Sequence, residues 1–127
     1  MLTRLFLALI AVLYFAFGTW SLFDPIGMTS RLDVDVSGPN GIFEMRGVFG
    51  GVSLGAALLA AAGAVMPARY ERPALLFLVA YMGGYTLSRI VSFFLGDGPT
   101  FSGWFFAGFE VLAFILAVTA LITRREP

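Results

Sequence analysis

Four long apolar runs separated by short polar breaks dominate the pattern along this chain. They cover about residues 5–23, 42–66, 74–95 and 100–123. Each run is close to the roughly 20 residues that an α-helix needs to cross the hydrocarbon core of a bilayer. The pattern therefore predicts an all-α fold, an integral membrane four-helix bundle that forms one transmembrane domain over residues 1–127.

Proline and glycine mark the ends of the predicted helices. The first run stops at Asp24-Pro25, because proline cannot continue a helix and restricts the residue before it. Residues 67–73 predict a charged turn after the second run, and Gly96-Asp97-Gly98-Pro99 separates the third run from the fourth. Arg4 followed by an apolar run also fits a signal peptide, but the run is long for that segment and no A-x-A site follows it. We expect an uncleaved membrane helix.

The longest connection is the polar segment 24–41, which ends on the turn-forming residues Gly38-Pro39-Asn40-Gly41. Within it, the alternation of apolar and acidic residues over 32–36 fits a short strand across the mouth of the bundle. An irregular loop fits this segment equally well. We expect residues 24–41 to form the outer loop of the protein.

Composition supports the membrane assignment and removes several kinds of chemistry. Hydrophobic residues make up 59% of the chain and charged residues 13%, and the mean hydropathy is +0.90. These values are far from those of soluble domains. The chain has no cysteine and no histidine, and all eight of its basic residues are arginine. Disulfide frameworks, thiolate or imidazole metal sites and Schiff-base lysines are therefore excluded.

The arginines indicate how the helices cross the membrane. Five arginines fall at one end of the predicted spans, whereas the other end has Arg31 as its loop cation and carries Asp24, Asp33, Asp35 and Asp97. By the positive-inside rule, both termini are cytoplasmic and the acidic loops face outward. We expect a multi-pass protein of the inner (cytoplasmic) membrane. The five agreeing arginines are Arg4, Arg69, Arg72, Arg124 and Arg125.

Two acids and two arginines lie within the predicted spans, and we call Glu44, Arg46, Arg89 and Glu110 the charged quartet. Charged side chains are costly in lipid, so they face a bundle interior or a water-filled cavity and usually pair. Helical rise places all four in the outer half of the membrane. Arg89 and Glu110 belong to helices joined by a short loop, which predicts an ion pair. Glu44 and Arg46 are two residues apart and point to different sides of one helix.

Glycines recur at helical spacing beside the quartet. Gly47, Gly51 and Gly55 are four residues apart, a pattern that lets helix backbones approach closely in lipid. They predict a packing face inside the bundle. A seam between two copies of the chain is the alternative.

A tyrosine stripe leads to one member of the quartet. Tyr81 and Tyr85 precede Arg89 at intervals of four residues, so the three side chains share one helix face. This stripe either lines a cavity or packs inside the bundle with its hydroxyls hydrogen-bonded. Both interpretations fit the spacing.

The combination of these residues resembles a known family. Residues 44–51 read Glu-Met-Arg-Gly-Val-Phe-Gly-Gly, and they occur with Asp24-Pro25 at the end of the first helix, Arg89 in the third and Glu110 in the fourth. This set resembles the bacterial four-helix membrane family catalogued as domain of unknown function 4345, which is distantly similar to DoxX-like proteins. Phe49 stands where the family pattern has tyrosine. The resemblance implies a fold and leaves function open.

Three classes of function fit these residues. We favour a protein that binds a hydrophobic small molecule or lipid, or an accessory protein, in which the quartet with Tyr81 and Tyr85 forms a polar site in the outer half. An intramembrane enzyme acting on a lipid or terpenoid, with Glu44 or Glu110 as general acid or base, is the second class. A proton-coupled transporter subunit is the third. A purely structural role, in which the quartet fixes helix register, stands beside them.

The expected partners follow from the same residues. They are membrane lipid, a hydrophobic small molecule, and a second copy of the chain or a larger membrane complex. No basic patch supports nucleic-acid binding. The charges of the two carboxylates are already balanced by two arginines, which disfavours a metal site, and we expect no cofactor.

Overall fold

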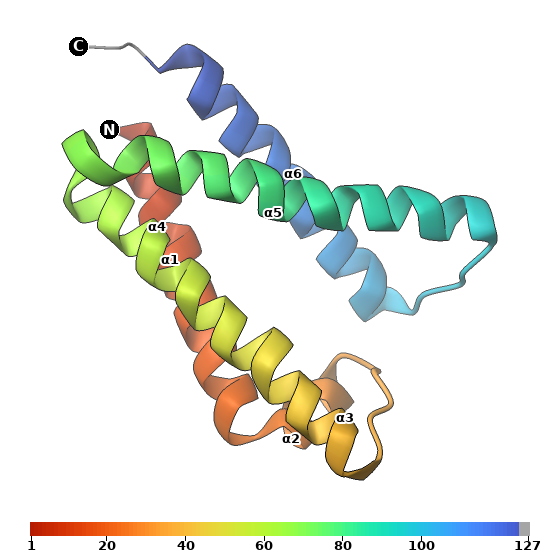
Figure 1. The fold of residues 1–127 in the computed structure, drawn as a ribbon. Coiled ribbons are helices and arrows are strands. Elements are labelled where there is room, and N and C mark those ends of the chain that lie inside the picture. Colours follow the sequence, from red (N-terminus) through yellow and green to blue (C-terminus); the bar gives the residue numbers. More distant parts are fainter. Residues whose placement is uncertain (125–127) are drawn as a thin grey trace. The chain divides into compact units, whose positions relative to one another are not determined.

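The computed structural model describes residues 1–124, and every regular element in that range is a helix (Figure 1). Four helical segments are long and apolar enough to cross a membrane: Leu2–Phe23, Gly38–Val65, Pro67–Leu95 and Phe101–Thr123. The prediction of an all-α, multi-pass membrane protein is confirmed. Arg125, one of the cations used to orient the chain, lies outside the described residues.

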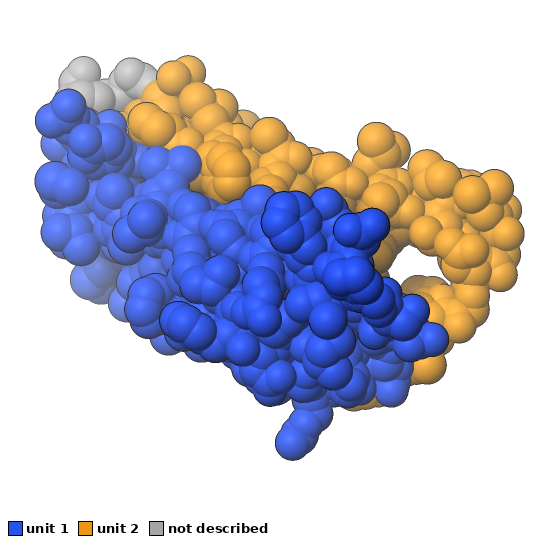
Figure 2. Space-filling view, turned by 60° about the horizontal axis from the view of Figure 1, so that its bottom comes forward, with its two compact units in different colours: residues 1–71 blue, residues 72–127 orange. Residues whose placement is uncertain are grey.

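The chain divides into two compact units, residues 1–71 and 72–127 (Figure 2). The boundary between them falls within a helix. The second unit contains most of α5 (Pro67–Leu95) and all of α6 (Phe101–Thr123). The first unit contains α1 (Leu2–Phe23), α2 (Pro25–Arg31), α3 (Gly38–Met45), the π-helix η1 (Arg46–Gly51) and α4 (Val52–Val65).

The core of the first unit lies where α1 packs against α4 and η1. Large side chains of α1 meet small ones of α4, which lets the helices come close together. Leu7 and Ile10 of α1 are fully buried, as are Ala56, Ala57 and Ala60 of α4. In lipid, such close packing is a main source of attraction between helices.

Each end of this helix pair is held by an arginine from the opposite helix. Arg4, near the start of α1, donates from Nε to the carbonyl of Ala64 at the end of α4, over 2.8 Å. Arg46, at the start of η1, donates from Nη1 to the carbonyl of Leu22 in the last turn of α1. The last carbonyls of a helix have no partner within it, and leaving them unpaired away from water is costly. The two arginines therefore secure the antiparallel contact of α1 with α4.

The predicted outer loop is largely helical, and the alternative of a short strand within it is wrong. Asp24 ends α1 and also begins α2, because its Oδ1 accepts a hydrogen bond from the backbone N–H of Gly27 and Pro25 suits a first turn. A Cβ at Gly27 would lie 2.1 Å from that carboxylate. Pro39 likewise occupies the first turn of α3, where the sequence predicted a non-helical turn. Residues 32–37 alone connect the two helices, with turn and irregular backbone.

The π-helix η1 makes the second span irregular in its middle. It covers Arg46–Gly51 and runs without a break from α3 into α4. A π-helix closes each turn with an i→i+5 hydrogen bond, so its turns are wider than those of an α-helix. The rotation from one residue to the next is therefore smaller in this segment than in the α-helices on either side of it.

The second unit begins within α5, which starts earlier than predicted. The charged segment 67–73, expected as a turn, forms the first part of this helix, with Pro67 at the position that proline favours. The break before it is confined to Met66, whose backbone leaves the helical region with φ −124° and ψ 67°. Pro73 lies inside the helix.

The predicted break between the third and fourth spans is confirmed. α5 ends at Leu95, and Gly96 takes the left-handed backbone with φ +83°. The N–H of Asp97 donates to the carbonyl of Ser92 over 3.1 Å, and that of Gly96 donates to Phe93 over 3.2 Å. This pair of bonds is the Schellman motif, which satisfies carbonyls that the helix end leaves open. It returns the chain sharply into α6.

Candidate functional site

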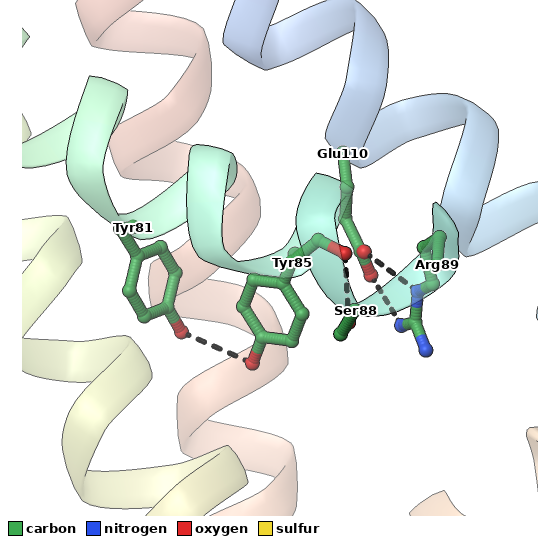
Figure 3. Close-up of polar contacts among 5 residues, drawn as sticks. All are labelled: Tyr81, Tyr85, Ser88, Arg89 and Glu110. Atoms are coloured by element: carbon green, nitrogen blue, oxygen red, sulfur yellow. Dashed lines mark hydrogen bonds and ion pairs between the residues drawn. The ribbon is translucent and has the colours of Figure 1, made fainter. Parts of the chain in front are cut away.

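The second unit contains the predicted ion pair between Arg89 of α5 and Glu110 of α6 (Figure 3). Arg89 Nε donates to Glu110 Oε2 over 2.9 Å, and Nη2 donates to Oε1 over 2.7 Å. This bidentate geometry is the strong form of a carboxylate–guanidinium contact. The Glu110 side chain is 5% exposed, whereas that of Arg89 is 41% exposed. The pair is therefore only partly buried, and its open side is that of the guanidinium.

The tyrosine stripe predicted beside Arg89 forms a chain of aromatic contacts along α5. The rings of Tyr81 and Tyr85 meet edge to face at 5.1 Å, and Arg89 Cζ lies 5.7 Å from the centre of the Tyr85 ring. The two tyrosine hydroxyls face each other at 3.5 Å, which is long for a hydrogen bond (Figure 3). Ser88 Oγ donates to the carbonyl of Tyr85 over 2.7 Å. Tyr85 thus supports the guanidinium through its ring rather than through its hydroxyl.

An open groove of about 690 Å³ lies beside the ion pair, between stripes of side chains from α5 and α6. Its volume is in the range of sites for small molecules. Among the residues that the structure describes, Arg89 is the one charged residue in its lining, and most of the others are apolar. The lining residues are Thr86, Arg89, Ile90, Phe93 and Phe94 from α5, and Trp104, Ala107, Gly108, Val111, Leu112 and Ile115 from α6.

One polar atom in this groove lacks a partner. Thr86 Oγ1 is the one buried side-chain oxygen or nitrogen within residues 1–124 that makes no hydrogen bond. A threonine in a helix ordinarily bonds back to a carbonyl of the preceding turn, as Thr29 does to Pro25 over 2.8 Å. A buried hydroxyl left unpaired costs free energy, which a hydrogen bond to a bound water or ligand would recover.

Sequence reasoning singled out neither Thr86 nor Trp104 as a site residue. The available signal was the spacing of the groove residues, which follow one another by three and four positions on both helices around the ion pair. Phe114 of α6 packs on Gly83 of α5, where an added Cβ would be 3.1 Å from the ring. Gly83 thereby brings the two helices together near the groove.

The other two quartet residues, Glu44 and Arg46, lie in the first unit. Arg46 satisfies the carbonyl of Leu22, as described above. Glu44 is exposed and makes no hydrogen bond or ion pair with the described residues of its own unit. The structure thus brings Arg89 to Glu110 and gives Arg46 a backbone partner. A shared site of all four residues stays a prediction.

Gly47, Gly51 and Gly55 do not form the contact between α1 and α4. All three glycines are exposed, and a Cβ at Gly47 or Gly55 would meet no atom within 4 Å. Packing of this face against another span and a seam between two copies both stay predictions.

The close contact with α1 uses Gly18 and Gly50 instead. A Cβ at Gly18 would lie 3.0 Å from the carbonyl oxygen of Gly50, and a Cβ at Gly50 would lie 3.1 Å from the backbone of Leu22. Gly50 is buried, in contrast to the predicted glycines on either side of it. The close approach of α1 to the second span therefore uses small residues, as expected for helices that pack in lipid.

No group of three or more histidine, cysteine, aspartate or glutamate side chains in residues 1–124 is placed to hold a metal ion. The candidate site is thus an ion pair in an apolar groove. Its chemistry is that of hydrogen-bond donation by a guanidinium and a hydroxyl.

Comparison with known proteins agrees with the family resemblance. The family model described as Domain of unknown function (DUF4345) matches residues 2–121. No curated protein and no solved structure matches the chain. The matched range includes the first three apolar spans, all but the last two residues of the fourth, and the Arg89–Glu110 pair. The chain therefore belongs to the family described as Domain of unknown function (DUF4345).

Proposed function

We propose that this protein binds a hydrophobic small molecule or lipid in the groove between α5 and α6, with the polar end of the ligand at the Arg89–Glu110 pair. The observation that carries this proposal is the half-open ion pair within an apolar groove. The inner (cytoplasmic) membrane, with both termini in the cytoplasm, is the location that the arginine distribution supports.

The guanidinium of Arg89 has donors available for a ligand. Arginine has five N–H groups, and two of them bond to Glu110. The remaining three have no acceptor among the described residues, and Arg89 lines the groove. Nearby, Thr86 Oγ1 lacks a partner as well. A ligand with an oxygen acceptor would therefore satisfy groups that the protein leaves open.

Binding is better supported than catalysis by Glu110. Both of its carboxylate oxygens accept from Arg89, and its side chain is 5% exposed. A general acid or base must reach the proton that it transfers, which this geometry does not favour. A purely structural ion pair is also less well supported, because such a pair has no need of an adjoining groove or of the unpaired Thr86 hydroxyl.

The test is the composition of lipid that the protein retains. The protein would be extracted from its native membrane in polymer-bounded discs, and the bound lipids would be measured by mass spectrometry against the bulk membrane. We expect one amphiphile class to be enriched with the wild-type protein and lost in the Arg89→Gln, Glu110→Gln double variant. Arg31→Gln, an exposed arginine outside the groove, is the control. A wild-type profile equal to the bulk membrane would refute the proposal.

A further inference from the structure

We infer that the occupant of the groove is an uncharged, single-chain lipid whose polar end carries both a carbonyl and a hydroxyl oxygen, as in a monoacylglycerol. This inference rests on the proposed function and names the chemical class of its ligand. It follows from the charge of the site, from the arrangement of its open hydrogen-bonding groups and from the length of the groove.

The charge of the site favours a neutral ligand. Arg89 and Glu110 neutralise each other, and no other charged residue of the described range 1–124 lines the groove. An anionic headgroup would leave a net negative charge among apolar side chains and close to Glu110. A cationic one would find both Glu110 oxygens already bonded to Arg89. Because uncompensated charge is costly at membrane depth, an uncharged oxygen acceptor fits best.

The open polar groups suit a ligand with two oxygens. The free N–H groups of Arg89 donate, whereas the Thr86 hydroxyl both donates and accepts. The two residues are three positions apart on α5, so they are neighbours on one helix face, with Cβ atoms about 5–6 Å apart. An ester carbonyl at Arg89 and a glycerol hydroxyl at Thr86 would satisfy both groups at once.

The length of the groove on either side of the polar contact accommodates part of one acyl chain. Along α6 it extends from Trp104 to Ile115, which corresponds to about 16 Å of helix. Apart from Arg89 and Thr86, its lining is apolar, with the indole of Trp104 at one end. Glu110, and with it the charged contact, lies in the middle of this length. A chain would therefore lie against apolar side chains next to the bound polar end.

Trp104 provides a direct probe of this site. The chain has two tryptophans, so Trp20→Phe leaves Trp104 as the single fluorophore. The Trp20→Phe protein would be placed in nanodiscs of ordinary phospholipid and titrated with dibromostearoyl glycerol, whose bromines quench indole fluorescence. We expect saturable quenching that is reversed by the unbrominated lipid.

The matched anionic probe is dibromostearoyl glycerol phosphate, which differs only by its phosphate. We expect it to bind roughly tenfold more weakly, the ratio that corresponds to about 1.4 kcal/mol. Thr86→Val removes one hydroxyl at nearly constant shape and should weaken the neutral probe roughly fivefold. Ser88→Ala, which removes a hydroxyl outside the groove on the same helix, should leave its affinity unchanged.

The outcomes separate this inference from the proposed function. Saturable quenching by the phosphate probe that equals or exceeds that of the neutral probe would overturn the uncharged class and leave lipid binding in place. Equal affinity of Thr86→Val and the wild type would overturn the two-oxygen contact. If neither probe quenches Trp104 saturably, because the groove is covered by protein or binds nothing, both the inference and the proposed function fail.

Discussion

The Arg89–Glu110 pair predicts an asymmetric loss of stability when either partner is removed. Arg89→Gln leaves Glu110, whose side chain is 5% exposed, without its two charged donors. An uncompensated buried charge of this kind costs about 3 kcal/mol of unfolding free energy. Glu110→Gln leaves Arg89, which is 41% exposed and has a long flexible stem that reaches water or headgroups, so the cost is about 1 kcal/mol.

The double variant measures the coupling between the two side chains. With both residues changed to glutamine no charge is stranded, and we expect a total loss of about 2 kcal/mol, some 2 kcal/mol less than the sum of the single losses. Unfolding by SDS in mixed micelles, followed by helical circular dichroism, gives these free energies. Arg31→Gln, an exposed arginine of α2, is the control and should change stability by less than about 0.5 kcal/mol.

Two results would refute this reasoning. Single losses that add within about 0.5 kcal/mol would mean that Arg89 and Glu110 do not interact in the membrane protein. A larger loss for Glu110→Gln than for Arg89→Gln would mean that the arginine, and not the glutamate, is the buried partner. The second result would also remove the basis for free guanidinium donors in the groove.

Three further predictions concern the first unit. Arg46→Met should lower the unfolding free energy by about 1–3 kcal/mol, because it leaves a carbonyl at the end of α1 unpaired, and its melting temperature in detergent should fall accordingly. Gly50→Val should destabilise by about 1–3 kcal/mol through overlap with the α1 backbone, whereas Gly51→Ala should be neutral or stabilising, and equal melting temperatures would contradict this. A membrane-impermeant thiol reagent on intact cells should label Ser37→Cys and spare Thr3→Cys, and the reverse pattern would invert the topology.

The spans and the ion pair could be predicted because they depend on residues that are close together in the sequence. Apolar length alone identifies a membrane helix, and the break at Gly96 places α5 and α6 next to each other in sequence. Two opposite charges at similar depths on neighbouring helices form an ion pair because an unpaired charge is costly in the membrane, as Arg89 and Glu110 show. None of this required knowledge of distant contacts.

The face of the second span that meets α1 could not be predicted, because small residues occur on more than one face of this span. Glycine spacing alone does not say which of these faces is buried. In the structure Gly47 and Gly51 are exposed and Gly50 makes the close contact. The role of Asp24 as the cap of α2 was also missed. This one residue ends α1 and begins α2, and the pattern of apolar residues does not indicate such a double role.

The polar groups of the two units have different partners, and this difference supports the binding site proposed in the second unit. In the first unit, Arg4 and Arg46 satisfy helix-end carbonyls, and the buried Thr29 hydroxyl bonds to a carbonyl of its own helix. In the second, Thr86 Oγ1 has no partner within residues 1–124, and three N–H groups of Arg89 have no acceptor there either, beside an apolar groove. A protein selected for stability alone would gain from hydrogen-bond partners for these groups, since unpaired polar atoms cost free energy. Their concentration at one groove is what a binding site requires, because a ligand that satisfies them recovers that free energy on binding.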